Sequence, residues 1–530
     1  MQAVTALPES DIQAALEAEI LALKNEVAEL KSQVAWFTRH MFGEKSEKRL
    51  EPYQDQADLL ASLDLNPELP ESPAMEKITY ERRKRGPKNR DGSITDDGIR
   101  FGEDVPVETI VQMPPEAKAI PEERWVVVGQ KVTRRLGQRP GSFVILEYVR
   151  PVIKDSADRP EDGKKAKLYT APAPENVLDR SIADVSLLAG MLVDKFVYHL
   201  PLYRQHQRMG DAGITLARST LSVLVSRAID QLDPICEAQY RSILKSAVLG
   251  MDETPIKAGR KARGKMRQGQ LWPLYGDRDE VVFKYTDSRK HEHVRKLLGE
   301  YFSGTLLTDG YEGYASYAKV MEKITHAVCW SHARRKFEGA LDAEPKAADQ
   351  ALALIGLLYA HEKEIRKEGL SGRKKLDYRT EHSLPVVKAF WDWCERQCNR
   401  HDLLPSNPLA KALKYAMERK VPLQVFLSDP DVPLDTNHVE RAVRPIAMGR
   451  KNWLFCWTEV GAKRVAVIQS LLVTCRLHGI DPYVYLVDVL QRVGQHPARD
   501  VADLTPRIWK EKFGHDPLRS DLDRIRDGPG

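Results

Sequence analysis

Hydrophobic positions near the start of the chain recur with the spacing of a coiled coil. Between residues 12 and 42 they fall on two seven-residue registers that lie three and four positions apart. The registers hold Ile20, Val27, Val34 and Met41, and Leu16, Leu23, Leu30 and Phe37. β-Branched residues on one register with leucine on the other favour a parallel dimer. We therefore expect residues 1–50 to form a coiled coil that joins two or more copies of the chain. The alternative is one amphipathic helix packed on its own domain.

The pattern changes three times before the middle of the chain. Residues 51–104 are acidic and then basic, which predicts a flexible basic linker. Residues 105–180 contain short apolar runs broken by Gly and Pro, so they predict a small β-rich module with strands at 125–128 and 143–149. Residues 181–245 have helical periodicity, with helices expected at 201–209 and 218–229. This pair is typical of a helix–turn–helix DNA-binding domain, and an ordinary helical hairpin fits the same residues.

The second half of the chain alternates strands and helices. Over residues 246–340 we expect a strand at 247–251, a hairpin at 271–275 and 280–285, a helix at 291–301 and strands at 304–308 and 325–330. Residues 341–430 are helical with no catalytic motif and predict an insertion. Residues 431–495 predict the second part of the interrupted domain, and 496–530 a C-terminal tail. The predicted fold class is therefore a multidomain α/β protein.

Three acidic residues stand in distinctive settings in this half. Asp252 and Asp309 each end a short apolar run that predicts a buried strand, and Glu440 lies in a helical pattern. This order of elements is expected of an RNase H-like fold, in which the strands carrying the two aspartates are neighbours. Adjacent carboxylates repel and raise each other's pKa, and a divalent cation removes that penalty. The residues therefore predict a site for two Mg²⁺ or Mn²⁺ ions that acts on phosphodiester bonds.

Other residues are expected to support this site or to bind DNA. His332 and Asn437 are expected beside the carboxylates, whereas Glu253 neighbours Asp252 and on a strand would point to the opposite face. Candidates for DNA contacts lie in the basic linker, in the predicted helix–turn–helix and in basic clusters near the predicted site; a solvated tether, solvated loops and helix faces are the alternative. The candidates are Arg82, Arg83, Lys84, Arg85, Arg218, Arg260, Lys261, Arg263, Arg334, Arg335, Arg444, Arg450 and Lys451.

Composition agrees with a soluble enzyme. The chain has 530 residues, of which 42% are hydrophobic and 30% are charged, and its net charge of +5 is unevenly spread. We find no apolar run of membrane-spanning length and no signal-peptide pattern, and six irregularly spaced cysteines form no disulfide framework. We therefore expect a cytoplasmic, nucleoid-associated protein.

Short motifs along the chain resemble a known family. They are FGEKSE at 42–47, LPLYRQ at 200–205, MDETP at 251–255, TDGY at 308–311, CWSHARRKF at 329–337, NHVERAVR at 437–444, GRKNWLF at 449–455, TCR at 474–476 and GIDP at 479–482. In this order they resemble the large transposase of the insertion-sequence sixty-six family, a group of bacterial DDE transposases. The resemblance implies a catalytic triad of Asp252, Asp309 and Glu440, recognition of terminal inverted repeats, strand cleavage followed by transfer, and small accessory proteins as partners.

One segment departs from the family pattern. Members of the family that the chain resembles usually carry a cysteine-rich, zinc-finger-like segment between the basic linker and the helical domain, but residues 105–180 contain no cysteine. We therefore expect no zinc there. Two other functions fit the same residues: an RNase H-like nuclease, such as a junction resolvase, and a catalytically silent DNA-binding regulator derived from a transposase.

Overall fold

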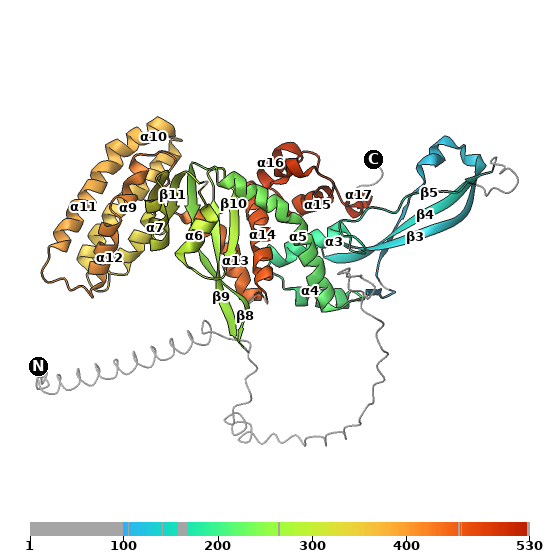
Figure 1. The fold of residues 1–530 in the computed structure, drawn as a ribbon, viewed down its shortest axis with the longest axis horizontal. Helices are drawn as coiled ribbons and strands as arrows, with labels where there is room; N and C mark the ends of the chain where they lie inside the picture. Colours follow the sequence, from blue (N-terminus) through green and yellow to red (C-terminus); the bar gives the residue numbers. More distant parts are fainter. Residues whose placement is uncertain are drawn as a thin grey trace, which may run out of the picture. The chain divides into compact units, whose positions relative to one another are not determined.

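The computed structural model describes residues 99–526, without Asp104, Pro140, 157–166, Arg263, Gly264, Tyr301, Leu454, Phe455 and Trp457 (Figure 1). The predicted coiled coil and the basic cluster Arg82–Arg85 lie outside the described residues. The described part is a mixed α/β structure, as expected. Among its helices none is long and apolar enough to cross a lipid bilayer.

The first sheet is built around one long hairpin. Its strands are β2 (Val107–Val111), β3 (Trp125–Arg139), β4 (Ser142–Asp155) and β5 (Tyr169–Thr170), in the order β2-β4-β3 with β5 paired to β4 (Figure 1). Short 3-10 helices (Pro115–Ala119 and Glu122–Arg124) connect β2 to β3. The strands are much longer than the two short strands predicted, because polar residues between the apolar runs also pair. Arg134 and Glu147, for example, form a cross-strand ion pair at 2.6 Å.

A helical region follows. It contains α3 (Val185–Phe196), α4 (Leu202–Asp211) and α5 (Arg218–Ile243), and the short strand β6 (Ile214–Thr215) between α4 and α5 pairs with β1 (Arg100–Phe101). The sequence predicted that the last helix would end at residue 229, but α5 continues through Pro234 to Ile243. Its buried apolar residues continue with helical spacing, and this packing outweighs the proline.

The central sheet has the strand order β10-β9-β7-β11-β12, with β8 paired to β9. Its strands are β7 (Val248–Met251), β8 (Thr254–Ala262), β9 (Lys265–Tyr275), β10 (Val281–Thr286), β11 (Gly304–Thr308) and β12 (Ile324–Val328). β7, β11 and β12 are parallel, and β9 is antiparallel to β7. The predicted strands and hairpin are present. β8 is one strand more than the sequence reasoning placed between the two aspartates.

Helices cover both faces of this sheet. Leu249 and Leu306 pack with α6 (His291–Leu298) and α7 (Glu312–Val320), whereas Val248 and Leu307 pack with helices of the insertion. The alternation follows from the two-residue period of a strand. α13 (Asn437–Trp453) lies against β7 at Gly250, where an added Cβ would stand 2.7 Å from a methyl carbon of Val439. Gly250 therefore permits the close approach of the helix that carries Glu440.

The C-terminal helices pack against the core of the helical region. α14 (Glu459–Leu477) contacts α5 and β10, and α15 (Pro482–Arg492) contacts α3. The segment predicted as a tail contains a 3-10 helix (Ala498–Leu504), α16 (Pro506–Lys512) and α17 (Asp521–Arg526). Trp509 of α16 is buried and its indole donates to Asp488 at 2.8 Å.

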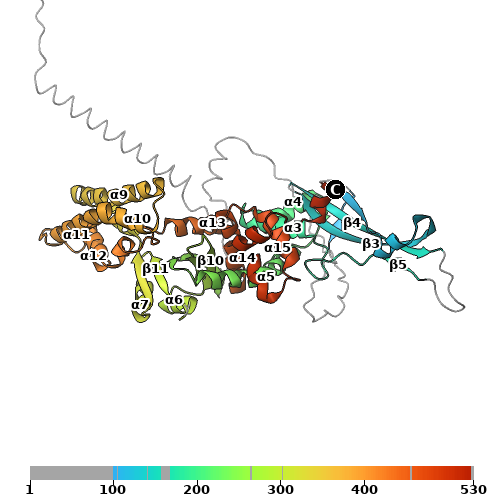
Figure 2. The ribbon, with the colours of Figure 1, turned by 90° about the horizontal axis from the view of Figure 1, so that it is seen from above.

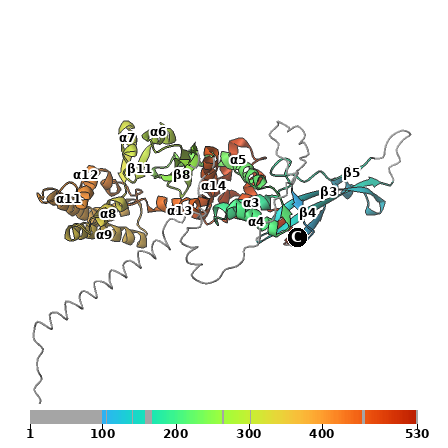
Figure 3. The same ribbon diagram turned by 90° about the horizontal axis from the view of Figure 1, so that it is seen from below.

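Residues 330–427 form a helical bundle. It contains α8 (Trp330–Glu338), α9 (Pro345–Lys367), α10 (Gly372–Tyr378), the π-helix η3 (Arg379–Ser383), α11 (Leu384–Cys398), α12 (Pro408–Glu418) and the 3-10 helix η4 (Pro422–Leu427). Figures 2 and 3 show α9, α11 and α12 gathered together. Its core is rich in aromatic residues, including Trp330, Phe337, Phe390, Trp391 and Trp393.

One buried arginine links this bundle to the chain that leads to α13. Arg379 is fully buried and its Nε and Nη2 donate to the two carboxylate oxygens of Glu362 at 2.7 and 3.0 Å. The remaining N–H groups donate to the carbonyl oxygens of Phe426, Asp429 and Val432 at 2.5, 3.0 and 3.1 Å. All five donors of the guanidinium are therefore satisfied.

Removing this arginine is expected to destabilise the bundle strongly. Arg379→Met leaves Glu362 buried without its partner, so we predict a loss of about 3–5 kcal/mol in the free energy of unfolding. Urea unfolding followed by tryptophan fluorescence measures it, because Trp330, Trp391 and Trp393 belong to the same core. Arg373→Met is the control, since that side chain is 85% exposed. A loss below about 1 kcal/mol for Arg379→Met would show that the network is dispensable.

Candidate active site

Two aspartates meet at the ends of adjacent parallel strands. In the register of β7 and β11, Leu307 lies opposite Gly250. Asp252 follows the last residue of β7 and Asp309 follows the last residue of β11. Oxygens of Asp252, Glu253 and Asp309 all lie within 4.8 Å of one another. Backbone N–H groups of Glu253 and Tyr311 donate to Asp252 Oδ1 and Asp309 Oδ1, each at 2.8 Å, and fix both carboxylates.

Glu253 belongs to this cluster, which corrects the expectation that it points to the opposite face. β7 ends at Met251 and β8 begins at Thr254, so the strict alternation of a strand does not apply between them. Both oxygens of Glu253 are occupied: the Tyr314 hydroxyl donates to Oε2 at 2.6 Å, and Arg289 forms an ion pair with Oε1. The sequence reasoning missed both partners. Tyr314 stands in the same motif as Asp309, but no sequence signal distinguishes Arg289.

The cluster is electrostatically unfavourable in the absence of a cation. Burial raises the pKa of Asp252 to about 7, and the neighbouring carboxylates of Glu253 and Asp309 add to the rise. Burial also raises the pKa of Glu253, while the hydrogen bond from Tyr314 opposes that rise. The fold therefore holds at least one carboxyl group that resists ionisation near neutral pH, as is common at functional sites.

The helical bundle positions the backbone of the second aspartate. From α12, the Tyr415 hydroxyl donates to the carbonyl oxygen of Asp309 at 2.5 Å. Arg419 donates through Nη2 and Nε to the carbonyl oxygen of Gly310 at 3.1 and 3.3 Å. Gly310 has a φ of +89°, a conformation that glycine adopts without strain. The bundle that showed no catalytic motif thus holds the turn that carries Asp309.

Glu440 stands apart from the three clustered carboxylates. It lies in the first turn of α13, and Asp435 accepts hydrogen bonds from the backbone and side chain of Asn437 at 3.0 and 2.5 Å at the start of that helix. Glu440 Oε1 accepts from Arg335 Nη2 at 2.7 Å. The carboxylate is therefore engaged by a cation of α8.

His332 connects Glu440 with the cluster. Its Nε2 accepts a hydrogen bond from Arg335 at 2.7 Å and lies 3.9 Å from Glu440 Oε1. Burial lowers the pKa of His332 and the Arg335 guanidinium lowers it further, while Asp309, Glu440 and Asp252 act in the opposite direction. The imidazole of His332 therefore interacts electrostatically with Asp252, Asp309 and Glu440, the three acidic residues predicted to be catalytic.

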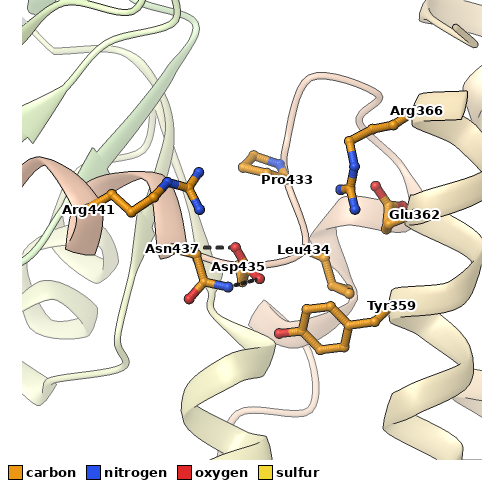
Figure 4. A pocket seen from close by; sticks show the side chains of 8 residues that line it. All are labelled: Tyr359, Glu362, Arg366, Pro433, Leu434, Asp435, Asn437 and Arg441. Atoms are coloured by element: carbon orange, nitrogen blue, oxygen red, sulfur yellow. Dashed lines mark hydrogen bonds between the residues drawn. The ribbon is translucent and has the colours of Figure 1, made fainter. Parts of the chain in front are cut away.

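Two adjoining cavities lie at the start of α13, and Glu440 lines one of them. The first, of about 530 Å³, is lined by Ser331, Arg334, Arg335, Gly356, Tyr359, Asn437 and Glu440. The second, of about 430 Å³, is lined by Tyr359, Glu362, Arg366, Pro433, Leu434, Asp435, Asn437 and Arg441 (Figure 4). Tyr359 and Asn437 belong to both. The sequence reasoning placed Asn437 and the two arginines of α8 near Glu440, but it assigned no part to α9.

The other basic residues expected to contact DNA are dispersed. Arg218 is the first residue of α5, Arg260 and Lys261 lie near the end of β8, and all three are exposed. Arg444 is exposed on α13, and Arg450 donates to the carbonyl oxygen of Pro255 at 2.6 Å, which ties α13 to β8. Outside the described part of the chain are Arg82, Arg83, Lys84, Arg85, Arg263 and the side chain of Lys451.

Replacing Asp252 is expected to stabilise the metal-free protein in a pH-dependent way. A pKa raised from 3.8 to about 7 means that the folded state binds the proton more tightly, so ionisation of Asp252 lowers stability as pH rises through that range. Asn mimics the neutral acid. Asp252→Asn should therefore match the parent near pH 4 and exceed it at pH 8 by up to about 4 kcal/mol in the free energy of unfolding.

Urea unfolding in EDTA at several pH values measures this difference. If the difference in the free energy of unfolding between variant and parent stays constant from pH 4 to pH 8, the pKa of Asp252 is not raised by the fold.

Comparison with known proteins identifies the family. The model of the IS66 transposase family matches residues 180–464, that of the IS66 C-terminal element residues 470–507, and that of the transposase C IS166 homeodomain residues 29–110. Three similar proteins of Sinorhizobium fredii carry the names uncharacterized protein y4hP, y4jD and y4qI. The first is 32% identical over 77% of this chain and 76% of its own length. The other two are each 28% identical, y4jD over 93% of this chain and 97% of its own length, and y4qI over 94% and 93%. These matches confirm the resemblance seen in the motifs, and the chain belongs to the IS66 family of transposases.

Proposed function

We propose that this chain is a DDE transposase that binds the terminal inverted repeats of an insertion element and catalyses metal-dependent DNA cleavage and strand transfer. The observation that carries the proposal is the meeting of Asp252 and Asp309 at the ends of β7 and β11. Glu440 lies outside the cluster of three carboxylates, on a helix that packs closely against β7, and its Oε1 is 3.9 Å from His332 Nε2. Family membership supports transposition as the biological role.

The sheet topology supports an RNase H-like catalytic domain. When β8 is left out and β7, β9, β10, β11 and β12 are numbered 1 to 5, the strand order across the sheet is 3-2-1-4-5. Strand 2 is antiparallel to strand 1, and strand 4 is parallel to it. This is the order expected of that fold. It places the strands of the two aspartates side by side, as the sequence reasoning required.

The donor set suits Mg²⁺ or Mn²⁺. Carboxylate oxygens are the ligands that these ions prefer, and a cation offsets the repulsion that helps to raise the pKa of Asp252. In our proposal Asp252, Asp309 and Glu440 hold the ions. When bound, two such ions supply activation of the attacking water or 3′-hydroxyl and stabilisation of the leaving oxygen.

The contacts separate the roles of the neighbouring residues. Glu253 is a positioning residue in this proposal, since Tyr314 and Arg289 occupy both of its oxygens. Glu440 is held by a single cation, Arg335, that a DNA phosphate can attract away. His332 and Asn437 then support the site by fixing Arg335 and the start of α13.

DNA binding is proposed to extend beyond the catalytic centre. It involves the basic linker, the start of α5, the tip of β8, and arginines of α8 and α13, which are the residues predicted from the sequence. Assembly through the coiled coil and help from accessory proteins complete the proposed complex.

Three single substitutions test the assignment of the catalytic acids. With purified full-length protein, Mg²⁺ and DNA carrying the element's own ends, Asp309→Asn and Glu440→Gln should each reduce cleavage by about a thousandfold or more. The reason is that several kcal/mol of metal-dependent stabilisation are lost. Glu253→Gln should stay within about tenfold of the parent, because the amide oxygen can still accept from Arg289 while the amide N–H group donates to the Tyr314 hydroxyl oxygen.

The products of the same assay discriminate between the candidate functions. Cleavage with joined product that disappears in EDTA supports the transposase. Cleavage without joining would indicate a nuclease, and binding without cleavage a silent regulator. A Glu253→Gln variant as inactive as Asp309→Asn, together with an active Glu440→Gln variant, would show that the third ligand is Glu253.

A further inference from the structure

A groove runs between the helical bundle and α13. Two cavities, one of them lined by Glu440, adjoin at Tyr359 and Asn437, and we call the pair the insertion groove. One wall is α9, with Gly356, Tyr359 and Arg366. The opposite wall is the segment 433–441, with Asn437 and Arg441 (Figure 4). Glu440 belongs to the same segment and lines the first cavity. The groove thus extends from Glu440, a proposed catalytic acid, to Arg366 of α9.

Gly356 stands where packing within the protein does not require glycine. It lies in the middle of α9, where glycine lowers helix stability relative to alanine. A Cβ added at this position would meet nothing within 4 Å. The residue is exposed and lines the same cavity as Glu440. The absence of a side chain at Gly356 therefore leaves space for a ligand in the groove.

Two arginines face the groove without a partner. Arg366 and Arg441 enter from opposite walls, and neither side chain forms a hydrogen bond or an ion pair with a described residue (Figure 4). The acidic groups beside them are engaged: Glu362 is neutralised by Arg379, and Asp435 accepts both hydrogen bonds of Asn437. A guanidinium group of this kind binds a phosphate through two parallel hydrogen bonds.

We propose that the insertion groove holds the DNA strand that leads to the scissile phosphate. Backbone phosphates lie between Arg366 and Arg441, and the strand passes Gly356 before it reaches Glu440. This inference rests on the proposed transposase function and gives the helical bundle a role in substrate binding. A chain of phosphodiesters fits the groove for two reasons. Arg366 and Arg441 offer a guanidinium group on each wall, and the α9 wall has no side chain at Gly356.

The charge part of the inference is tested by binding measurements in the uncleaving Asp309→Asn background. The probe is a fluorescent duplex that carries the element's end and its flank, and anisotropy is recorded at several salt concentrations with full-length protein. Adding Arg366→Gln or Arg441→Gln should weaken binding about five- to tenfold and lower the salt slope by about one, since each removes one phosphate contact. Arg373→Gln is the matched control on the same bundle, because that arginine is bonded to Asp377 outside the groove and should leave binding unchanged.

The steric part is tested at Gly356. Leucine is a better helix former than glycine, so Gly356→Leu should keep or raise the melting temperature while it fills the groove and weakens binding at least about tenfold. Gly356→Ala should raise the melting temperature with a binding loss below about threefold. This comparison separates an occupied groove from a folding defect.

The outcomes distinguish this inference from the function on which it rests. Unchanged binding in the Arg366, Arg441 and Gly356 variants, with cleavage by the parent still dependent on Asp309, would overturn the groove and leave the transposase proposal standing. Absence of any binding by the parent to its own element ends would overturn both.

Discussion

The parallel pairing of β7 with β11 is the constraint on which the rest of the site depends. It brings the ends of two strands together, so that oxygens of the two aspartates and of Glu253, which follows Asp252 in the chain, lie within 4.8 Å of one another. Such a cluster is unfavourable in isolation, and burial with like charge raises the pKa of Asp252 to about 7. The surrounding residues stabilise the carboxylates: Tyr314 and Arg289 bind Glu253, and backbone N–H groups donate hydrogen bonds to both aspartates. The remaining repulsion favours the binding of a divalent cation.

The helical bundle is part of this arrangement rather than an appendage. Tyr415 and Arg419 hold the turn after β11, and Arg379 fastens the bundle to the segment that leads into α13. Trp330 adds a further tie, because its backbone N–H donates to the carbonyl oxygen of Leu434 at 3.0 Å. A segment inserted between the strands and the last acidic residue thereby sets where that residue stands. The same bundle supplies α9, which forms one wall of the groove, so structural support and proposed substrate binding come from one set of helices.

The sequence predicted the parts of the fold that follow from local pattern. The apolar runs before Asp252 and Asp309 are strands, and the central hairpin and the helices of residues 341–430 are present, because burial on a strand or helix leaves a periodic trace. The orientation of Glu253 was wrong because it depends on where β7 stops, which periodicity does not reveal. The length of β3 and β4 was underestimated because polar residues pair across that hairpin. The separation of Glu440 from the cluster, and the partners Arg289, Tyr415 and Arg419, depend on tertiary contacts that no local pattern encodes.

The most direct test of the account is a crystal structure of the full-length protein with Mn²⁺ and DNA of the element end, with the ions located by anomalous scattering. The account predicts manganese bound by Asp252 and Asp309, with Glu440 turned from Arg335 toward the ions and Glu253 still held by Tyr314. Manganese bound by Glu253 in place of Glu440, or no manganese at the ends of β7 and β11, would contradict it.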